Sequence, residues 1–503
     1  MYARSLGATL NGIQPILVEI EVGLIRGLPG FQIVGLPDQS INEAKERINF
    51  ALNSISYKQP SKFNYRTSVN LAPAEIKKEG PQLDLPIALA FLKASGQLKN
   101  LPEDFIFLGE LGFDGSLRKI KGTLPILISA KTKGFSKVIL PQENLNEAKY
   151  INGLEIYTFS NLREVIDFLE GRKEKIPETF EVTDFEIDEE TELIFDPLWE
   201  RIVLIAAAGR HNLILAGPPG TGKTLIAENI RYLLPELSYE ESLEISKIYS
   251  ALGILDKLIK KPPFRSPHHS ASSAAILGGG RDAKPGEITL AHLGVLLFDE
   301  LPEFRRDVLE GIREPLEKHK ITITRAKEKI TYPAKFLFIG TLNPCPCGFY
   351  GDPQKECLCN ISEIKKYHKK ISGPIIDRID LYFYLPRMDS QKMLTLSEIK
   401  LSSFRDKVLN AIERMKQRFK NEKFHYNSEI PHNKLRSYIK LGLNEEKFLK
   451  NAIDRYALSL RSVHKILKVA RTIADLEESE NVNLNHLSEA LQYKFIENSL
   501  AKF

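Results

Sequence analysis

Residues 217–224 read GPPGTGKT, which is the spacing of a loop that binds the phosphates of a nucleotide. The loop lies between the apolar run NLILA and the segment LIAENI, so the sequence predicts a strand, the loop and then a helix. Backbone N–H groups at the start of such a helix donate to phosphate oxygens. We expect the nucleotide to contact Gly217, Pro218, Pro219, Gly220, Thr221, Gly222, Lys223 and Thr224.

Two of these side chains and a downstream acid pair have defined chemical tasks. Lys223 is expected to reach the β and γ phosphates, and Thr224 to hold Mg²⁺. The apolar run GVLLF ends in Asp299 and Glu300, which we expect to bind the metal and to orient the attacking water, respectively. Two acids after an apolar run are otherwise solvated charge at a strand end, but the phosphate loop favours the catalytic interpretation. The predicted cofactors are therefore ATP and Mg²⁺.

A third apolar run, KFLFIG, leads into Asn343. An amide at the tip of a strand can hydrogen-bond the attacking water or the γ-phosphate, which makes Asn343 a candidate sensor of the nucleotide. An asparagine before a proline is otherwise a turn former, and only the neighbouring motifs favour the sensor.

All four cysteines of the chain lie close together in the sequence. Cys345 and Cys347 form one pair, and Cys357 and Cys359 form a second pair nine residues later. Four thiolates from two pairs can hold a structural zinc ion in a closed tetrahedral site. The alternatives are four free cysteines in a tight loop, or redox-labile pairs, which a reducing cytosol disfavours.

Composition excludes several classes of protein. The chain has 503 residues, of which 43% are hydrophobic and 27% charged, as in an ordinary globular protein of several domains rather than a disordered or fibrous one. No apolar stretch has the ~18 residues of a membrane span, and no signal-peptide pattern precedes Glu19. We therefore expect a cytoplasmic protein with no membrane partner. A net charge of +5 is compatible with basic surfaces and does not by itself indicate nucleic acid.

The pattern along the chain predicts a multidomain α/β protein. Residues 1–170 alternate short β-rich runs with helical segments, and 171–195 form an acidic linker. Residues 196–390 alternate apolar strands with helices, which is typical of a parallel sheet covered by helices. Residues 391–503 are predicted to be all helical, because one apolar stripe recurs with helical spacing. That stripe consists of Val463, Ile466, Leu467, Ala470, Ile473 and Ala474.

Several long phrases resemble the YifB/ComM family of magnesium-chelatase-like AAA+ ATPases. They include FRSPHHSASSAAILGGG, KPGEITLAHLGVLLFDELPEF, LNPCPCG and LSLRSVHKILKVARTIADL, together with GLPGFQIVGLPD near the start. The resemblance spans nearly the whole chain. It implies a Lon-protease-like N-terminal domain, an AAA+ P-loop core and a helical lid. A family phrase of the form DVxGQ is replaced here by LIFDPLWERIVLIAAAGRHN, so the resemblance assigns no adenine contacts.

The resemblance also implies roles for two arginines. Arg378, in GPIIDRIDL, is similar to the arginine finger that this clade inserts into a neighbouring subunit's ATP site, which implies a homo-oligomeric ring, a hexamer. Arg461, in LSLRSVHK, resembles the second sensor, which brings lid helices onto the γ-phosphate. The alternative for either arginine is an ordinary ion pair.

The activity implied by the resemblance is branch migration of DNA in natural transformation and recombination, with branched or single-stranded DNA and recombination proteins as partners. A chelatase-type ATPase that remodels a protein partner is the alternative. A third class, an ATP-dependent protease, needs a serine nucleophile and a lysine base. The corresponding positions hold Gln82 and Leu124, so we expect the N-terminal domain to be non-catalytic.

Two further segments could contact the substrate. KITITRAKEKITYPA alternates as a β-hairpin does and places Arg325, Lys327 and Lys329 near its tip, where they could grip a phosphate backbone. A solvated basic turn is the alternative. His268 and His269 lie in a hydroxyl-rich stretch with no acid at a fixed spacing, so we interpret this segment as a subunit-interface or substrate loop.

Overall fold

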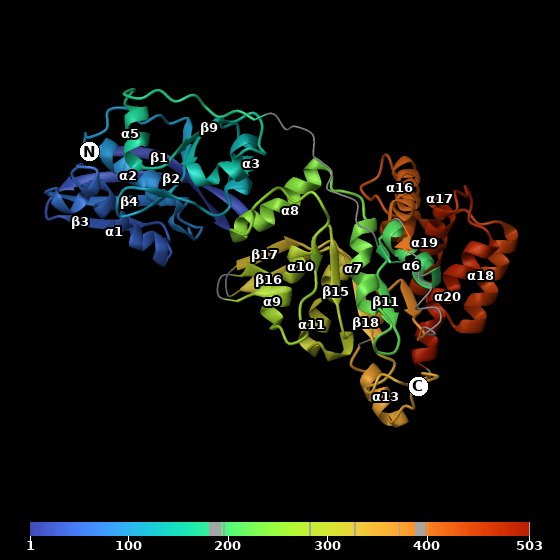
Figure 1. The fold of residues 1–503 in the computed structure, drawn as a ribbon. Coiled ribbons are helices and arrows are strands. Elements are labelled where there is room, and N and C mark those ends of the chain that lie inside the picture. Colours follow the sequence, from blue (N-terminus) through green and yellow to red (C-terminus); the bar gives the residue numbers. More distant parts are fainter. Residues whose placement is uncertain are drawn as a thin grey trace. The chain divides into compact units, whose positions relative to one another are not determined.

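The computed structural model describes residues 1–180, 193–194, 197–280, 283–325, 328–371, 373–387, 398–399 and 401–501. The acidic residues of the predicted linker, 186–192, and Lys327 of the predicted hairpin tip lie outside these residues. The chain divides into two compact units (Figure 1). Unit 1 comprises Met1–Glu186 and Tyr239–Ile259, and unit 2 comprises Ile187–Ser238 and Lys260–Phe503.

Unit 1 contains a four-stranded sheet in the order β1-β2-β4-β3 and a three-stranded parallel sheet in the order β5-β8-β9. The strands, with the small hairpin β6–β7, are β1 (Tyr2–Asn11), β2 (Gln14–Arg26), β3 (Gly30–Val34), β4 (Tyr65–Ala72), β5 (Phe105–Phe107), β6 (Glu110–Leu111), β7 (Leu117–Arg118), β8 (Lys137–Pro141) and β9 (Glu155–Phe159). Its helices are α1 (Gln39–Ser54), α2 (Asp84–Ala94), α3 (Thr123–Thr132), α4 (Leu145–Ala148), α5 (Leu162–Leu169) and α8 (Tyr239–Leu252).

Burial follows the local patterns of the sequence in unit 1. Strand β2 buries every second side chain, Val18, Ile20, Val22 and Leu24, because successive residues of a strand point to opposite faces. Helix α2 is buried on nearly all sides, which fits its almost uniformly apolar sequence. This unit therefore has a core of its own.

The two positions where a Lon-like protease would carry its serine and lysine are occupied by buried side chains in unit 1. Gln82, in the 3-10 turn Pro81–Leu83, is buried, and its amide donates to Thr9 Oγ1 at 3.0 Å and to the carbonyl of Glu79 at 2.7 Å. Leu124 is fully buried in α3. Neither side chain offers a nucleophile or a base.

Helix α8 comes from the middle of the ATPase sequence but packs in unit 1, against α3. Ser250 joins the two helices: its Oγ donates to Glu147 Oε2 at 2.5 Å and accepts from the backbone N–H of Leu124 at 3.2 Å. Burial raises the pKa of Glu147. The predicted ATPase domain, residues 196–390, included this segment. The local sequence pattern does not show which hydrophobic core an amphipathic helix will join.

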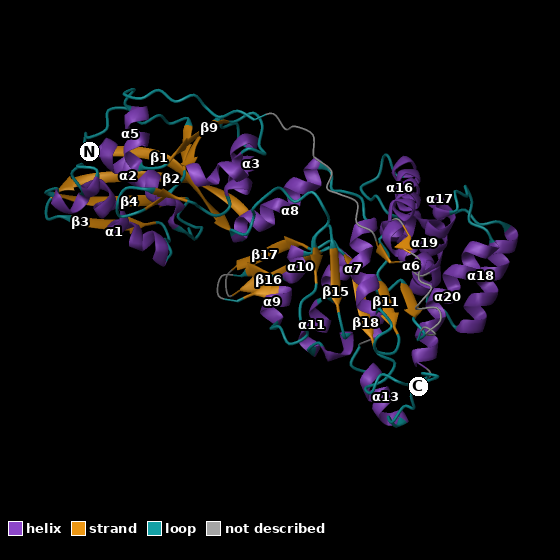
Figure 2. Cartoon of the chain, viewed as in Figure 1, coloured by secondary structure: helices purple, strands orange, loops and turns teal. Residues whose placement is uncertain are grey.

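Unit 2 is built on a five-stranded sheet in the order β12-β15-β18-β11-β19, in which every neighbouring pair is parallel. Figure 2 shows these strands with helices gathered around them. The strands are β11 (Leu213–Ala216), β12 (Phe264–Arg265), β15 (Val295–Phe298), β18 (Leu337–Leu342) and β19 (Leu381–Tyr384). Three small antiparallel pairs are β10 (Leu193–Ile194) with β20 (Glu398–Ile399), β13 (Gly278–Gly279) with β14 (Lys284–Pro285), and β16 (Lys320–Arg325) with β17 (Glu328–Pro333).

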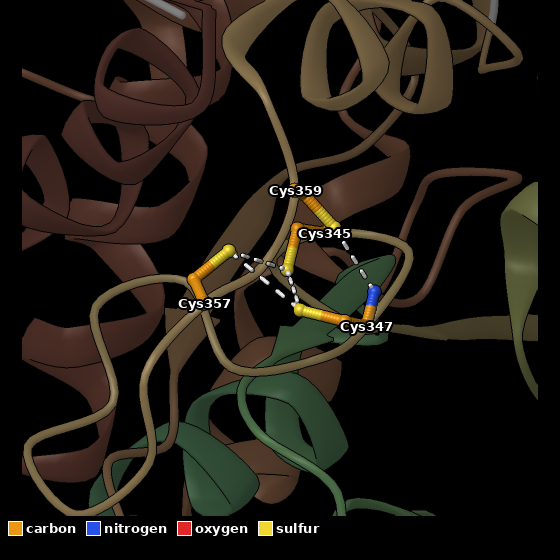
Figure 3. A group of neighbouring side chains, drawn as sticks. All are labelled: Cys345, Cys347, Cys357 and Cys359. Atoms are coloured by element: carbon orange, nitrogen blue, oxygen red, sulfur yellow. Dashed lines mark hydrogen bonds between the residues drawn. The ribbon is translucent and has the colours of Figure 1, made fainter.

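The helices of unit 2 fall into two sets. Those between the strands or beside them are α6 (Pro197–Gly209), α7 (Lys223–Leu233), α9 (Ser273–Leu277), α10 (Glu287–Leu290), α11 (Arg306–Gly311), α12 (Arg313–Lys318), α13 (Ile361–His368) and α14 (Gly373–Ile376). Between β18 and α13 a loop carries all four cysteines (Figure 3). The C-terminal set, the lid, is α16 (Leu401–Arg418), α17 (Leu435–Tyr438), α18 (Leu443–Tyr456), α19 (Leu460–Leu476) and α20 (Leu484–Ala501).

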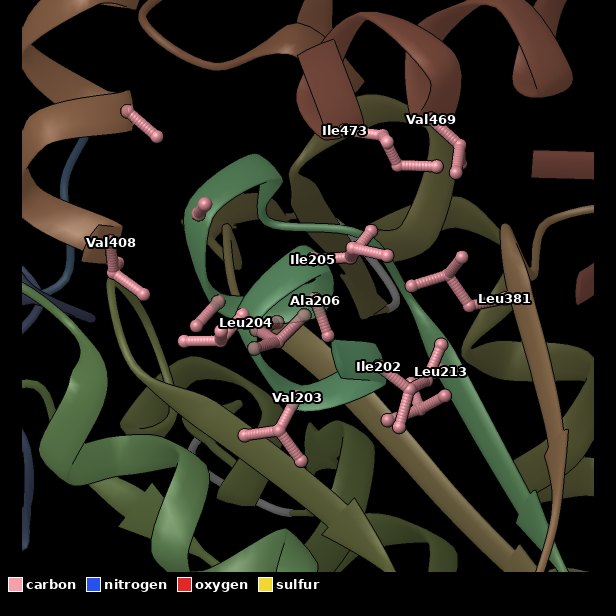
Figure 4. Packing of buried hydrophobic residues seen from close by; sticks show 14 of the residues in the cluster. Ile202, Val203, Leu204, Ile205, Ala206, Leu213, Leu381, Val408, Val469 and Ile473 are labelled. Carbon is pink, nitrogen blue, oxygen red and sulfur yellow. The ribbon is translucent and has the colours of Figure 1, made fainter. Parts of the chain in front are cut away.

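One hydrophobic core joins the sheet of unit 2 to the lid. Helix α6 supplies a nearly continuous apolar run between Leu213 and Leu381 of the sheet and Val469 and Ile473 of α19 (Figure 4). The predicted stripe on α19 is buried except for Leu467, which is partly buried against the same core. The mixed α/β fold with a C-terminal helical region is thus confirmed. No helix among the described residues is long and apolar enough to cross a membrane.

We predict that Ser250→Ala loosens the packing of α8, because it leaves the N–H of Leu124 and the buried carboxylate of Glu147 without this hydroxyl, a loss of about 1–3 kcal/mol. Hydrogen–deuterium exchange of the α3 and α8 amides should accelerate accordingly. Ser242→Ala is the matched control, because the Ser242 hydroxyl is buried in the same helix without a hydrogen-bond partner. Equal exchange in the two variants would contradict this account.

Candidate nucleotide-binding site

The predicted site residues gather at one edge of the sheet of unit 2. Because β11, β15 and β18 are parallel neighbours, their carboxyl ends meet there. The 217–222 loop follows β11, Asp299 and Glu300 follow β15, and Asn343 follows β18. The phosphate loop thus lies beside the acid pair and the candidate sensor.

Two glycines of the loop are required by its shape. Gly222 precedes α7 with a φ of 84°, a left-handed conformation that favours glycine. A Cβ on Gly217 would lie 2.3 Å from the carbonyl oxygen of Leu385, so any larger residue would push the loop away from β19. Thr221 Oγ1 donates to the carbonyl of Pro218 at 3.0 Å and closes the turn.

The Lys223 ammonium is held inside the loop. Its Nζ donates to the carbonyls of Gly217 at 2.7 Å and Pro218 at 2.8 Å, and to Asn343 Oδ1 at 3.2 Å. Burial lowers the pKa of Lys223 to about 8, against the opposing effect of Asp299 and Glu300. A partly desolvated cation at the start of a helix is strongly attracted to phosphate, which restores a full counter-charge.

Oxygen donors suited to Mg²⁺ converge next to the lysine. Thr224 Oγ1 lies 3.3 and 3.2 Å from the two carboxylate oxygens of Asp299. Hydroxyl and carboxylate oxygens, with phosphate and water, are the ligands that Mg²⁺ takes in such sites. The residues therefore fit the predicted metal.

Thr341 is a member of the site that the sequence analysis did not assign. Its hydroxyl donates to Asp299 and accepts from the backbone N–H of Glu300 at 3.0 Å. It thereby fixes both acids relative to β18. A hydroxyl at the tip of a strand next to an acid-bearing strand is the signal that could have indicated this role.

Glu300 is positioned by its backbone and has an unexpected neighbour. Its φ of 55° places it in the left-handed region, and its side chain is 54% exposed at the open edge of the site. His269 Nδ1 lies 3.7 Å from Glu300 Oε2. The sequence interpretation left His269 in an interface or substrate loop, because the short strand β12 before it has no apolar run that would reveal it.

The two arginines do not join this cluster. Arg378 precedes β19, and its carbonyl accepts from the side chain of Asn212, which precedes β11. Arg378 therefore lies at the amino edge of the sheet, and strand β11 separates it from the phosphate loop by roughly 13 Å. Its guanidinium is bound by Glu317, which lowers the pKa of that carboxyl.

Arg461 lies with Arg378 rather than with Lys223. It is 3.9 Å from both Glu317 Oε1 and Asp377 Oδ2, and its side chain is half exposed. One turn along α19, Lys465 donates to the carbonyl of Ile379 at 2.9 Å, which fixes this end of the helix at the amino edge. The structure therefore places Arg461 beside Arg378 and Glu317, and its contact with a γ-phosphate stays a prediction.

The four cysteine sulfurs form a compact group (Figure 3). Cys345 Sγ lies 3.3 Å from Cys347 Sγ and 3.6 Å from Cys357 Sγ, and all four sulfurs, with that of Cys359, lie within 4.8 Å of one another. A disulfide needs about 2.05 Å, whereas a tetrahedron with Zn–S bonds of about 2.3 Å has edges of about 3.8 Å. The group therefore fits a bound metal ion.

The cysteine loop is packed against the phosphate loop. A Cβ on Gly348, which has a φ of 84°, would lie 2.8 Å from Pro219 Cδ. At the other side His368 Nε2 lies 2.9 Å from the carbonyl oxygen of Pro344, next to Asn343. Residues that hold this loop in shape therefore also hold Asn343 and Pro219 in place.

Comparison with known proteins gives three family matches along the chain. Residues 196–393 match the family described as magnesium chelatase, subunit ChlI; residues 20–144 match subunit ChlI of Mg-chelatase, and 400–494 its C-terminal family. The chain is 38% identical to competence protein ComM of Haemophilus influenzae over 506 residues, covering 98% of this chain and 97% of the relative. It is also 38% identical to the uncharacterized protein YifB of Escherichia coli, covering 97% and 96%. Lon protease 2 of Bacillus subtilis is 28% identical over 167 residues, 30% of each protein.

We predict that Glu300→Gln and Lys223→Ala separate hydrolysis from binding. Glu300→Gln keeps the size of the side chain but removes the base, so nucleotide binding should persist while hydrolysis falls about 10²–10⁴-fold. Lys223→Ala removes the buried cation and should weaken binding itself. Titration with a fluorescent ATP analogue and a phosphate-release assay would measure the two effects. Full hydrolysis by Glu300→Gln would refute the role of that side chain.

Proposed function

We propose that this chain, which belongs to the YifB/ComM family of magnesium-chelatase-like AAA+ ATPases, works as a ring-shaped motor that moves branched or single-stranded DNA. Family membership supports the ATPase activity with ATP and Mg²⁺. The observation that carries the proposal is the separation of Arg378 from Lys223 at opposite edges of one sheet. Such a site is complete only when a second copy contributes the arginine.

The ring follows from this division of the site. A planar cation beside the γ-phosphate stabilises the charge that develops during hydrolysis. Arg378 cannot supply it to its own nucleotide, so we assign it to the neighbouring subunit's site. Arg461 lies beside it and would enter the same interface. The carboxyl edge of one subunit's sheet then faces the amino edge of the next subunit's sheet. Such a head-to-tail contact can close into a ring, which we propose is a hexamer.

Within one site the residues have the following proposed tasks. Lys223 binds the β and γ phosphates in place of the carbonyls that it now contacts, and Thr224 and Asp299 hold Mg²⁺, which neutralises phosphate charge when bound. Glu300 accepts the proton of the attacking water, and Asn343 senses the γ-phosphate. Thr341 keeps the two acids in register.

The DNA substrate is proposed from two observations. The hairpin β16–β17 is present as predicted, and Lys320 and Lys329 on its strands are exposed. Lysines on a moving hairpin can hold a phosphate backbone without reading bases. The similar ComM protein is named as a competence protein, which supports a part in natural transformation. We propose branch migration as the activity, with recombination proteins as partners and the cytoplasm as the location.

A second candidate function is remodelling of a protein partner in the manner of a chelatase subunit. It is favoured by the magnesium chelatase families that match three parts of the chain. The two candidates differ in what should stimulate the ATPase: DNA for a DNA motor, and the protein client for a remodeller.

The DNA motor predicts displacement of strands on a forked substrate that depends on ATP. Raised salt should weaken it, because phosphate contacts release counter-ions. Lys327→Ala with Lys329→Ala should reduce displacement and leave nucleotide binding unchanged. Lys318→Ala is a matched control, since that exposed lysine lies on α12, outside the hairpin. A wild-type ring that hydrolyses ATP yet neither binds nor moves branched DNA at low salt would refute the proposal and favour the protein remodeller.

We also propose that the four cysteines hold a structural zinc ion. Four thiolates without an open position form a closed site, which stabilises a fold rather than performing chemistry. The site would keep the loop 344–360 in shape, and through Asn343 and Gly348 it would support the nucleotide site.

The zinc proposal predicts about one metal ion per chain in protein purified under reducing conditions, measured by mass spectrometry of the metal. Cys345→Ser should lose the metal and loosen the loop, since each ligand contributes to folding of the site. His368→Gln, which alters a neighbouring side chain that is no ligand, should keep it. Freshly reduced wild-type protein that contains no metal would end this proposal.

A further inference from the structure

Residues 25–30 of unit 1, where β2 ends and the chain turns into β3, form an apolar tip that none of the proposed tasks uses. Leu28 is 90% exposed and Ile25 is 68% exposed. The ring of Pro29 restricts the backbone after Leu28, and the N–H of Gly27 donates to the carbonyl of Asn64 at 3.2 Å. The tip is therefore tied to the start of β4, while its apolar side chains stay in solvent.

Exposed cations lie in the segments that form and adjoin this tip. They are Arg26, Lys58, Lys62 and Arg66. The two stretches that carry them, 22–37 and 47–74, contain no Asp or Glu. In the part of the chain that the structure describes, none of the four forms an ion pair, whereas the exposed Lys137 of the same unit pairs with Asp104. A single exposed leucine needs no explanation, but one among uncompensated cations indicates a binding surface.

The cations divide between the two faces of the sheet at its end. In the pairing of β2 with β4, Ile25 lies opposite Arg66 and Arg26 lies opposite Tyr65 (Figure 1). Successive pairs of a sheet point to opposite faces, so the two arginines lie on different faces. Arg66 lies on the solvated face with Ile25, and it donates to Gln32 Oε1 of β3 at 2.7 Å.

The two lysines belong to the other face, beyond its buried core. Tyr65 lies 6.2 Å from Phe63 between ring centres, and Lys58 Nζ lies 4.6 Å from the centre of the Phe63 ring. Lys62 Nζ donates at 3.3 Å to Asn53 Oδ1 of α1, the helix that packs into the core on this face. Three cations therefore lie on this side of the tip and one on the other.

This arrangement suits a nucleic acid whose two strands part at the tip. Cations on both sides can each hold a phosphate backbone without reading bases. An apolar side chain at the junction can press between neighbouring bases and unstack them, as leucine and isoleucine wedges do. An anionic membrane would call for a broader apolar face, such as that of an amphipathic helix.

We propose that the tip is a wedge for forked DNA, with Leu28 against the last base pair of the duplex. Arg66 holds the backbone of one parted strand, and the three cations of the other face hold the second strand. The wedge rests on the proposed function, because it needs a DNA substrate. It adds a site in unit 1 to the hairpin β16–β17 of unit 2: the hairpin moves DNA, and the wedge keeps its strands apart.

A forked DNA with 2-aminopurine next to the junction tests the wedge, because this base fluoresces more strongly when it is unstacked. Binding of the full wild-type chain should raise the fluorescence. Leu28→Ser should keep its affinity for the fork within about twofold, lose most of this rise and slow ATP-dependent displacement about three- to tenfold. Leu443→Ser is the matched control and should match wild type, because Leu443, on α18 of the lid, is 87% exposed.

Arg26→Gln combined with Arg66→Gln tests the phosphate contacts. This variant should bind the fork more weakly, and the slope of log affinity against log salt should become shallower by about 1.4–1.8, the share of two phosphate contacts. Lys137→Gln should leave both quantities unchanged, because Asp104 lies 3.0 Å from that ammonium and already compensates its charge.

The outcomes separate the wedge from the proposed function. If Leu28→Ser keeps the full fluorescence rise and the wild-type rate of displacement, the wedge is wrong and the DNA motor stands. Fork binding that depends on the two arginines, in a wild-type chain that displaces no strand with ATP, would contradict the motor and support the wedge. Smaller assemblies of Leu28→Ser in native mass spectrometry would overturn the wedge and assign the tip to a contact between copies of the chain.

Discussion

The parallel order of the five-stranded sheet in unit 2 is the constraint on which the rest of the chemistry depends. It collects Lys223, Asp299 and Asn343 at the carboxyl edge, where the start of α7 can bind phosphate, and it leaves Arg378 at the amino edge. The core formed by α6, the sheet and α19 then holds Arg461 at that same edge. The amino and carboxyl ends of the strands stay a strand length apart, because the sheet is rigid. The fold therefore separates Arg378 from the phosphate loop, and we propose that a neighbouring copy completes the site.

The carboxyl edge is held together by shared hydrogen bonds rather than by isolated contacts. Asn343 Oδ1 accepts from Lys223, Thr341 links both acids to β18, and the cysteine loop packs on Pro219. A buried ammonium without such partners would cost several kcal/mol. The position of each of these groups therefore depends on its neighbours at the same edge of the sheet.

The sequence could predict the parts of this site that are local. The spacing of residues 217–224 already implies the loop, and acids directly after an apolar run must lie at a strand end. The proximity of His269 to Glu300 could not be predicted, because it depends on the pairing of the two-residue strand β12 with β15. The position of Arg461 depends on how α19 packs, and the membership of α8 in unit 1 on which core it covers. Packing between elements that are far apart in the sequence is not visible in the local periodicity of hydrophobic residues.

A mixing experiment tests most directly whether the site is divided between subunits. Arg378→Ala rings lack the proposed cation at every site, and Lys223→Ala rings lack nucleotide binding at every site, so each should be inactive alone. In mixed rings some interfaces combine an intact Lys223 site with an intact Arg378 from the neighbour, and ATPase should return in proportion to their number. Mixed rings whose composition is verified by native mass spectrometry, and which recover no activity, would contradict the account.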